Sequence, residues 1–172
     1  MRVLPRMKVV VPADSKQTEA AVETIATTDG PCYMRTSRAA TPVMDDAPDF
    51  VFGKAVVHRK GSDLALVACG VEVYQCLLAA DELSQEGVEC SVVDCATVDP
   101  LDAETVCEAA RACGRVMTVE EHQIVGGLGE AVAGTLLENG ALVPMRRHGM
   151  TGQFGQTGPA ASLLDHYHLD GP

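Results

Sequence analysis

Basic residues are scarce in this sequence. Lysine and arginine together number 13 among 172 residues, against 24 aspartates and glutamates, so the formal net charge is −11 at pH 7. A chain with this excess of negative charge repels a phosphate backbone instead of gathering along it. Nucleic acid is therefore not expected as a partner.

Long hydrophobic runs are also missing. No apolar stretch approaches the roughly 20 residues that a helix needs to cross a bilayer. The first residues, Met1–Leu4, lead into a strand-like run and not into the apolar region of a signal peptide. These features predict a soluble cytoplasmic protein without a membrane partner.

Metal-binding and redox patterns are absent among the cysteines and histidines. The seven cysteines form no C-x-x-C pair, show no Cys/His metal spacing and lie in apolar runs, at positions 32, 69, 76, 90, 95, 107 and 113. We interpret them as small apolar core residues of a protein in a reducing compartment. His58, His148, His166 and His168 are expected at the surface or at an interface, and no metal site is predicted.

The first 38 residues have the pattern of an incomplete α/β unit. A β-branched run at Lys8–Val11 predicts a strand, and Asp14 with Gln17 has the spacing of a capping box for a helix over Lys16–Ala26. A turn then leads to a short strand at Cys32–Met34. Residues 39–51 are rich in proline and aspartate, which is typical of a surface linker.

Residues 52–172 follow a repeated βα pattern that predicts a complete domain. The middle strands are continuous apolar runs, as expected for parallel strands that are covered by helices on both faces. We therefore predict a three-layer α/β fold with a mostly parallel sheet. The expected strands are Ala55–His58, Leu64–Cys69, Cys90–Cys95, Arg115–Val119 and Val143–Arg147, and the expected helices are Val71–Gln85, Asp102–Cys113, Leu128–Glu138 and Ala160–His166.

A glycine-rich segment, Gly126-Gly127-Leu128-Gly129, opens one of these helices just after a strand. A dinucleotide-binding loop would have its third glycine at Val132, and the preceding acidic residues would oppose a pyrophosphate. We interpret the glycines as allowing the start of the helix to lie close to a neighbouring segment.

Glu120, Glu121 and His122 come at the carboxyl end of a predicted strand, where open α/β sheets bind ligands. Neighbouring side chains on a strand point to opposite faces, so the two glutamates cannot act together on one substrate. We expect one glutamate to accept hydrogen bonds from local backbone N–H groups and the other to face solvent or a partner subunit. Glu121 and His122, with Gly126 and Gly127, are candidates for a crevice or an interface.

Two arginines, Arg35 and Arg38, follow the predicted strand at Cys32–Met34. The planar guanidinium group suits a phosphate or carboxylate, which predicts an anion anchor. An ion pair with Asp45 or Asp46 at the surface is an equal alternative. The residues alone therefore indicate a well-formed sheet and no complete active site.

Several motifs, in order along nearly the whole chain, resemble the C-terminal section of transketolase, as found in the C-terminal subunit of split transketolases. They are Val9–Asp14, Asp29–Arg35, Phe52–Ala55, Gly61–Asp63, Val98–Asp102, Thr118–His122, Gly126–Gly129 and Phe154–Gly158. The Glu-Glu-His and Phe-Gly-x-Thr-Gly motifs are more similar to transketolase than to deoxyxylulose-phosphate synthase.

The resemblance implies that residues 1–38 end a pyrimidine-binding domain and that residues 52–172 form the C-terminal domain, with a mixed five-stranded sheet. It implies thiamine diphosphate and Mg²⁺ in the complete enzyme, held by segments other than this chain, which is expected to be inactive alone. Arg38, in the Ser37-Arg38 context, matches the family's sugar-phosphate anchor, and Arg35 matches a basic position of some relatives. No catalytic residue carries over.

The implied activity is transfer of a two-carbon ketol unit between sugar phosphates, including pentose phosphates. The implied partners are an N-terminal transketolase part or subunit and a second copy in a homodimer. Three alternatives stay open. The chain could be a non-catalytic α/β module that binds a ligand or partner, or the C-terminal part of either a deoxyxylulose-phosphate synthase or a 2-oxo acid dehydrogenase β subunit.

Overall fold

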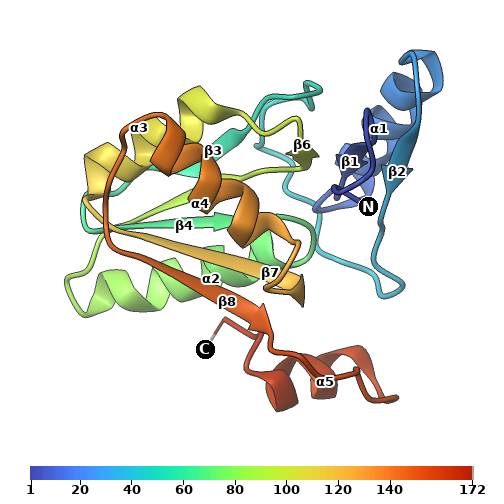
Figure 1. The fold of residues 1–172 in the computed structure, drawn as a ribbon. Coiled ribbons are helices and arrows are strands. Elements are labelled where there is room, and N and C mark those ends of the chain that lie inside the picture. The colour runs from blue at the N-terminus through green and yellow to red at the C-terminus, as the bar shows by residue number, and fades with distance from the viewer. Residues whose placement is uncertain (172) are drawn as a thin grey trace.

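The computed structural model describes residues 1–171 and contains eight strands and five helices in the order of Figure 1. The strands are β1 (Lys8–Val10), β2 (Cys32–Met34), β3 (Val56–Arg59), β4 (Leu64–Ala68), β5 (Cys90–Asp94), β6 (Thr97–Asp99), β7 (Val116–Gln123) and β8 (Met145–Met150). The helices are α1 (Ser15–Thr27), α2 (Glu72–Gln85), α3 (Ala103–Cys113), α4 (Leu128–Glu138) and α5 (Ala160–Tyr167). Among these residues, no helix combines the length and the apolar character that a membrane crossing requires.

The larger sheet has five strands in the order β3-β5-β4-β7-β8. The strands β5, β4, β7 and β8 are parallel to one another, and β3 is antiparallel to β5 at one edge. Helices α3 and α4 cover one face of this sheet and α2 covers the other, while α5 lies beyond the end of β8 (Figure 1). The predicted three-layer α/β fold with a mixed, mostly parallel five-stranded sheet is confirmed.

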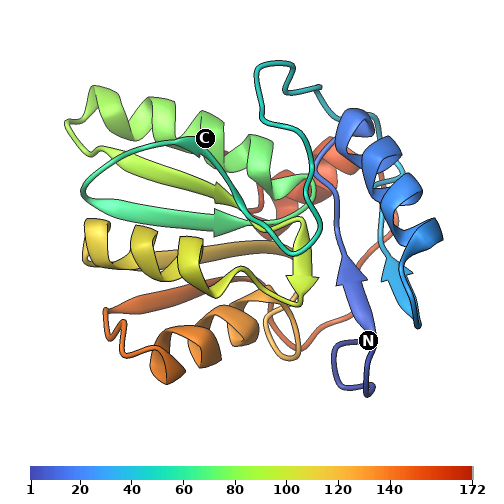
Figure 2. The ribbon, with the colours of Figure 1, turned by 90° about the horizontal axis from the view of Figure 1, so that it is seen from above.

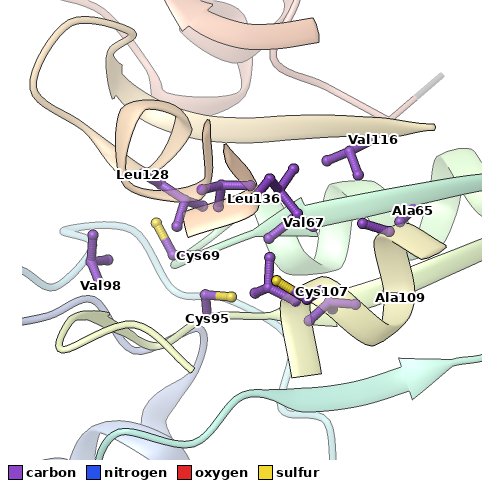
Figure 3. Close-up of a cluster of buried hydrophobic side chains, with 14 of the residues drawn as sticks. Ala65, Val67, Cys69, Cys95, Val98, Cys107, Ala109, Val116, Leu128 and Leu136 are labelled. Atoms are coloured by element: carbon purple, nitrogen blue, oxygen red, sulfur yellow. The ribbon is translucent and has the colours of Figure 1, made fainter. Parts of the chain in front are cut away.

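Side chains of the central strands alternate between two cores, because successive residues of a strand point to opposite faces. Ala65 and Val67 pack toward α3 and α4, against Cys107 and Leu128 among others (Figure 3). Leu66 and Ala68 belong to the second core, under α2. Six of the seven cysteines are buried, as the apolar runs predicted, and Cys32 on β2 is only half-buried.

Helix ends agree with the capping residues read from the sequence. Asp14 caps α1 by accepting a hydrogen bond of 2.8 Å from the backbone N–H of Gln17. Asp102 caps α3, and Gly114 ends that helix in the left-handed conformation that glycine favours. The observed ends of α1 and α3 therefore lie within one or two residues of the ends that the capping residues predicted.

A short strand that the sequence analysis missed, β6, joins the N-terminal segment to the rest. It pairs antiparallel with β1, which in turn pairs parallel with β2, so a second sheet has the order β2-β1-β6. Figure 2 shows β6 turned away from the five-stranded sheet toward β1. Strand β6 has only three residues and follows closely after β5, so the sequence shows no separate apolar run for it.

Polar contacts also fix the N-terminal segment to the larger sheet. The side-chain amide of Gln17 on α1 donates to the carboxylate of Asp94 at the end of β5, with a distance of 2.7 Å. His58 Nε2 lies 3.6 Å from the same carboxylate oxygen, Oδ2 of Asp94. His58 was expected at the surface or at an interface, and its side chain is not at the surface of the chain, being only 7% exposed.

Candidate functional site

The carboxyl ends of β4 and β7 form the switch point of the larger sheet. Strand β4 connects through α2 to β5 on one side, and β7 connects through α4 to β8 on the other. In open α/β sheets the crevice at such a point is the usual place for a ligand. The residues that follow β2 reach this edge, since Arg35 Nη1 donates to the backbone carbonyl of Glu121 at 2.5 Å.

Strand β7 is four residues longer than expected at its carboxyl end, so Glu120, Glu121 and His122 lie within it. Glu120 is 1% exposed, whereas Glu121 and His122 are exposed. The prediction that the two glutamates point to opposite faces is confirmed. The apolar pattern ended at Val119, so sequence analysis could not detect the polar continuation of the strand.

The carboxylate of Glu120 occupies the N-terminus of α4. Its Oε2 accepts from the backbone N–H of Leu128 at 2.7 Å and its Oε1 accepts from that of Gly129 at 2.8 Å. The N-terminus of a helix attracts an anion because its first N–H groups lack partners and its dipole is positive there. The expectation that one glutamate bonds local backbone N–H groups is thus confirmed for Glu120.

The Glu120 carboxylate leaves no room for a side chain at Gly127 in the glycine-rich segment. A Cβ on Gly127 would approach Glu120 Oε2 within 1.9 Å and the backbone carbonyl of Gln123 within 2.8 Å. Burial raises the pKa of Glu120, and the two backbone N–H groups and the nearby His122 oppose that rise. The start of α4 is therefore occupied by an internal carboxyl group and does not fit a diphosphate group.

A cavity of about 690 Å³ opens along the switch-point edge. Arg38 lines it from the segment after β2, together with Tyr74 of α2, Glu121 and His122 of β7, and Tyr167 of α5. The volume lies within the range of roughly 300–1,000 Å³ that is usual for small-molecule sites. No spacing pattern in the sequence indicated the contributions of α2 and α5 to this cavity.

The two arginines line different cavities. Arg35, with His122 and Gly126, lines a second cavity of about 100 Å³, while Arg38 lines the large one. Within residues 1–171, no ion pair links either arginine to Asp45 or Asp46. Arg38, Glu121 and His122 thus line the same large cavity. Gly127 instead lies against the Glu120 carboxylate. Their roles as binding residues stay predictions.

The acidic, histidine and cysteine side chains are dispersed over the fold. Over the described residues, no cluster of three or more histidine, cysteine, aspartate or glutamate side chains has a suitable arrangement. Burial raises the pKa of Cys69 to about 12, so its sulfur is a protonated thiol near neutral pH. The large cavity thus presents an arginine, a histidine and a carboxylate to the space that it encloses.

Comparison with known proteins identifies a family. Residues 53–172 match the family model described as "Transketolase, C-terminal domain". Over 170 residues, 98% of the chain, the sequence is 40% identical to the 6-deoxy-6-sulfo-D-fructose transketolase subunit SqwH of Clostridium sp. (strain MSTE9) and covers 52% of it. It is 36% identical over 174 residues, 99% of the chain, to 1-deoxy-D-xylulose-5-phosphate synthase of Thermomicrobium roseum and covers 28% of it.

A solved structure described as "Split gene transketolase, inactive beta4 tetramer" has a similar fold over 99% of the chain. The TM-score is 0.93 and the sequence identity is 41%. The chain covers 56% of that protein, so it spans about half the length of both the solved structure and the similar transketolase subunit.

Proposed function

Because the chain belongs to the transketolase family through the C-terminal domain of that family, we propose that it is the C-terminal portion of a thiamine-diphosphate-dependent transketolase. The complete enzyme transfers a two-carbon ketol unit between sugar phosphates, with pentose phosphates as substrates. The observation that carries the proposal is the match over nearly the whole chain to a transketolase subunit and to a split-gene transketolase structure.

The cofactor belongs to the other parts of this enzyme. Thiamine diphosphate with Mg²⁺ supplies the carbanion chemistry when it is bound. The residues of this chain do not fit that group, since Glu120 fills the helix N-terminus that could take a diphosphate and no described cluster suits a metal ion. We therefore assign to this chain an assembly role and a share in binding the substrate.

Arg38 is the proposed contact to the substrate phosphate. It is exposed, it lines the large cavity, and its guanidinium group can form a bidentate, charge-assisted pair with a phosphate. Arg35 is a weaker candidate, because its Nη1 already donates to the carbonyl of Glu121. It lies close enough to hold the phosphate-binding segment against β7.

The proposed partners follow from the relatives, about half of whose length the chain spans. An N-terminal transketolase part or subunit would complete the active site, in an assembly built around two copies of this chain. The similar solved structure is that of an inactive β4 tetramer of a split-gene transketolase, which supports the proposal that this portion alone has no activity. Location in the cytoplasm stays a prediction from the sequence.

A domain exchange tests the proposal. Residues 1–171 would replace the matching half of a split transketolase subunit, and the completed subunit would be combined with its N-terminal partner. We expect ketol transfer from a ketopentose phosphate to an aldopentose phosphate. We further expect Arg38→Ala to raise KM for the phosphorylated substrates by roughly 10- to 100-fold, with little effect on the unphosphorylated sugars.

The matched control is Arg115→Ala, an exposed arginine next to the amino end of β7, at the opposite edge of the sheet. Arg115→Ala should leave the KM for the phosphorylated substrates and the KM for the unphosphorylated sugars unchanged. A completed subunit that assembles with its partner and transfers no ketol unit would refute the proposed function.

A second function has a specific observation in its favour, the similarity to a 1-deoxy-D-xylulose-5-phosphate synthase. The same completed enzyme can be offered a 2-oxo acid as donor with an aldose phosphate as acceptor. Condensation with loss of carbon dioxide would favour the synthase, and transfer from a ketose phosphate favours transketolase.

A further inference from the structure

A buried carboxylate without a protein partner lies at the start of α2. Glu72 is 0% exposed, and neither of its carboxylate oxygens has a hydrogen-bond partner among the described residues. A buried polar group without a partner costs free energy, on the order of 1–3 kcal/mol or more for a charged group. Glu120 is also buried, but two backbone N–H groups donate to its carboxylate. Glu72 has no such donors, so hydrogen bonds within the fold do not account for its burial.

Glu72 lines a cavity of about 240 Å³ on the α2 face of the sheet. The walls are mostly aliphatic, and they include Leu66 of β4, Leu83 of α2 and Met117 of β7. Leu169 and Asp170 of the C-terminal segment also line it. The space is too small for a nucleotide or a sugar phosphate and has the size of a short-chain organic molecule.

The charges around Glu72 favour a cation as the occupant. Burial, and then the charges of Glu121 on β7 and of Asp170, raise the pKa of Glu72, whereas the charge of Arg35 lowers it. Arg35 is already engaged by the carbonyl of Glu121. Two histidines, His148 of β8 and His168, complete the titratable groups in the wall, with the thiol of Cys76. Besides Glu72, the acidic group in the wall is Asp170, and no lysine or arginine among the described residues lines the cavity.

We propose that this cavity binds a small organic cation, a short-chain primary alkylammonium. Its N–H groups donate to the carboxylate of Glu72, and its alkyl part packs against Leu66, Leu83 and Met117. The ammonium supplies the donors that both carboxylate oxygens lack, and its charge is balanced by Glu72 with help from Glu121 and Asp170. The site is separate from the proposed phosphate contact at Arg38, and it does not depend on ketol transfer.

Proton linkage is a signature of this site. Burial, then the charge of Glu121, raises the pKa of Glu72 to about 8, so the group is mostly protonated at pH 7. An alkylammonium with a pKa near that of lysine, about 10.4, stays charged and displaces this proton. The apparent affinity should rise roughly tenfold between pH 6 and pH 7 and level off above pH 8.

The experiment is a calorimetric titration of the full chain with n-butylammonium chloride at constant ionic strength, with n-butanol and sodium butyrate as probes of the same length. We expect saturable binding of n-butylammonium, about tenfold weaker binding of n-butanol, and none of butyrate. Titration at pH 7 in buffers of different ionisation enthalpy should show release of a proton.

Glu72→Gln keeps the shape and removes the charge, and it should weaken n-butylammonium binding by at least about tenfold. The matched control is Glu82→Gln, an exposed glutamate on the same helix, which should bind as the original chain does. The proton measurement needs no variant and therefore stands even if Glu72→Gln fails to fold.

Three outcomes would overturn the proposal. One is binding of n-butanol as tight as that of n-butylammonium, and another is binding without release of a proton at pH 7. The third is a change in sedimentation of Glu72→Gln without a change in amine affinity, which would mean that Glu72 meets a side chain of a neighbouring subunit instead.

Discussion

The contact between Glu120 and the start of α4 allows a quantitative prediction. Its carboxylate accepts two backbone hydrogen bonds, of 2.7 and 2.8 Å, from Leu128 and Gly129, and all three residues are buried. Glu120→Ala removes both acceptors and leaves two buried N–H groups without partners. Each hydrogen bond to a charged group contributes about 1.5–3 kcal/mol, and the cost of burying the carboxylate offsets part of that sum. We expect a net loss of about 2–4 kcal/mol.

The assay is equilibrium unfolding in urea, followed by circular dichroism. With a denaturant slope of about 2 kcal/mol per molar, the midpoint should fall by about 1–2 M. Glu120→Gln keeps one acceptor oxygen in place and should lose about half as much. The control is Glu121→Ala, the exposed neighbour on the same strand, which should change the free energy of unfolding by less than about 0.5 kcal/mol. Equal midpoints for Glu120→Ala and Glu121→Ala would refute the reasoning.

Further predictions concern stability, pH and substrate binding. Because burial raises the pKa of Glu72 from 4.5 to about 8 in the folded chain, the folded state holds the proton more tightly, and stability should fall as pH rises between these values. Glu72→Gln should remove that slope and stabilise the chain at pH 8 by up to about 4–5 kcal/mol, measured by urea unfolding at pH 5 and pH 8. Gly127→Ala should destabilise by at least about 2 kcal/mol because its Cβ would meet the Glu120 carboxylate. Gly134→Ala, a helical site with open space around the new Cβ, should instead stabilise by about 0.5–1 kcal/mol in the same assay. In the completed enzyme, phosphorylated substrates should have a raised KM after Arg38→Ala, and an unchanged KM would exclude the phosphate contact.

Sequence patterns predicted the larger sheet well because its signals are local. Continuous apolar runs such as Leu64–Ala68 mark strands that are buried on both faces, and Asp102 and Gly114 mark the ends of a helix. The missed strand β6 depends on a partner far along the chain, at β1, and three residues carry no pattern of their own. Long-range pairing of this kind is decided by the tertiary structure.

The candidate site was predictable only in part. Local chemistry pointed to Arg38, Glu121 and His122, but not to the walls that α2 and α5 contribute to the cavity. The sequence does contain a signal for Glu72, because this residue lies four residues before Cys76 and eight before Ala80 and so shares their buried helix face. An acidic residue on an apolar helix face, without a basic neighbour in sequence, indicates a buried carboxylate that has no partner.

We proposed above that this chain belongs to a transketolase whose cofactor is held by other segments. The most direct test of that proposal is a calorimetric titration of thiamine diphosphate with Mg²⁺ into two samples, the chain alone and the completed subunit with its N-terminal partner. We predict saturable binding to the assembled enzyme and no saturable heat with the chain alone. Stoichiometric, saturable binding to the isolated chain would contradict the account.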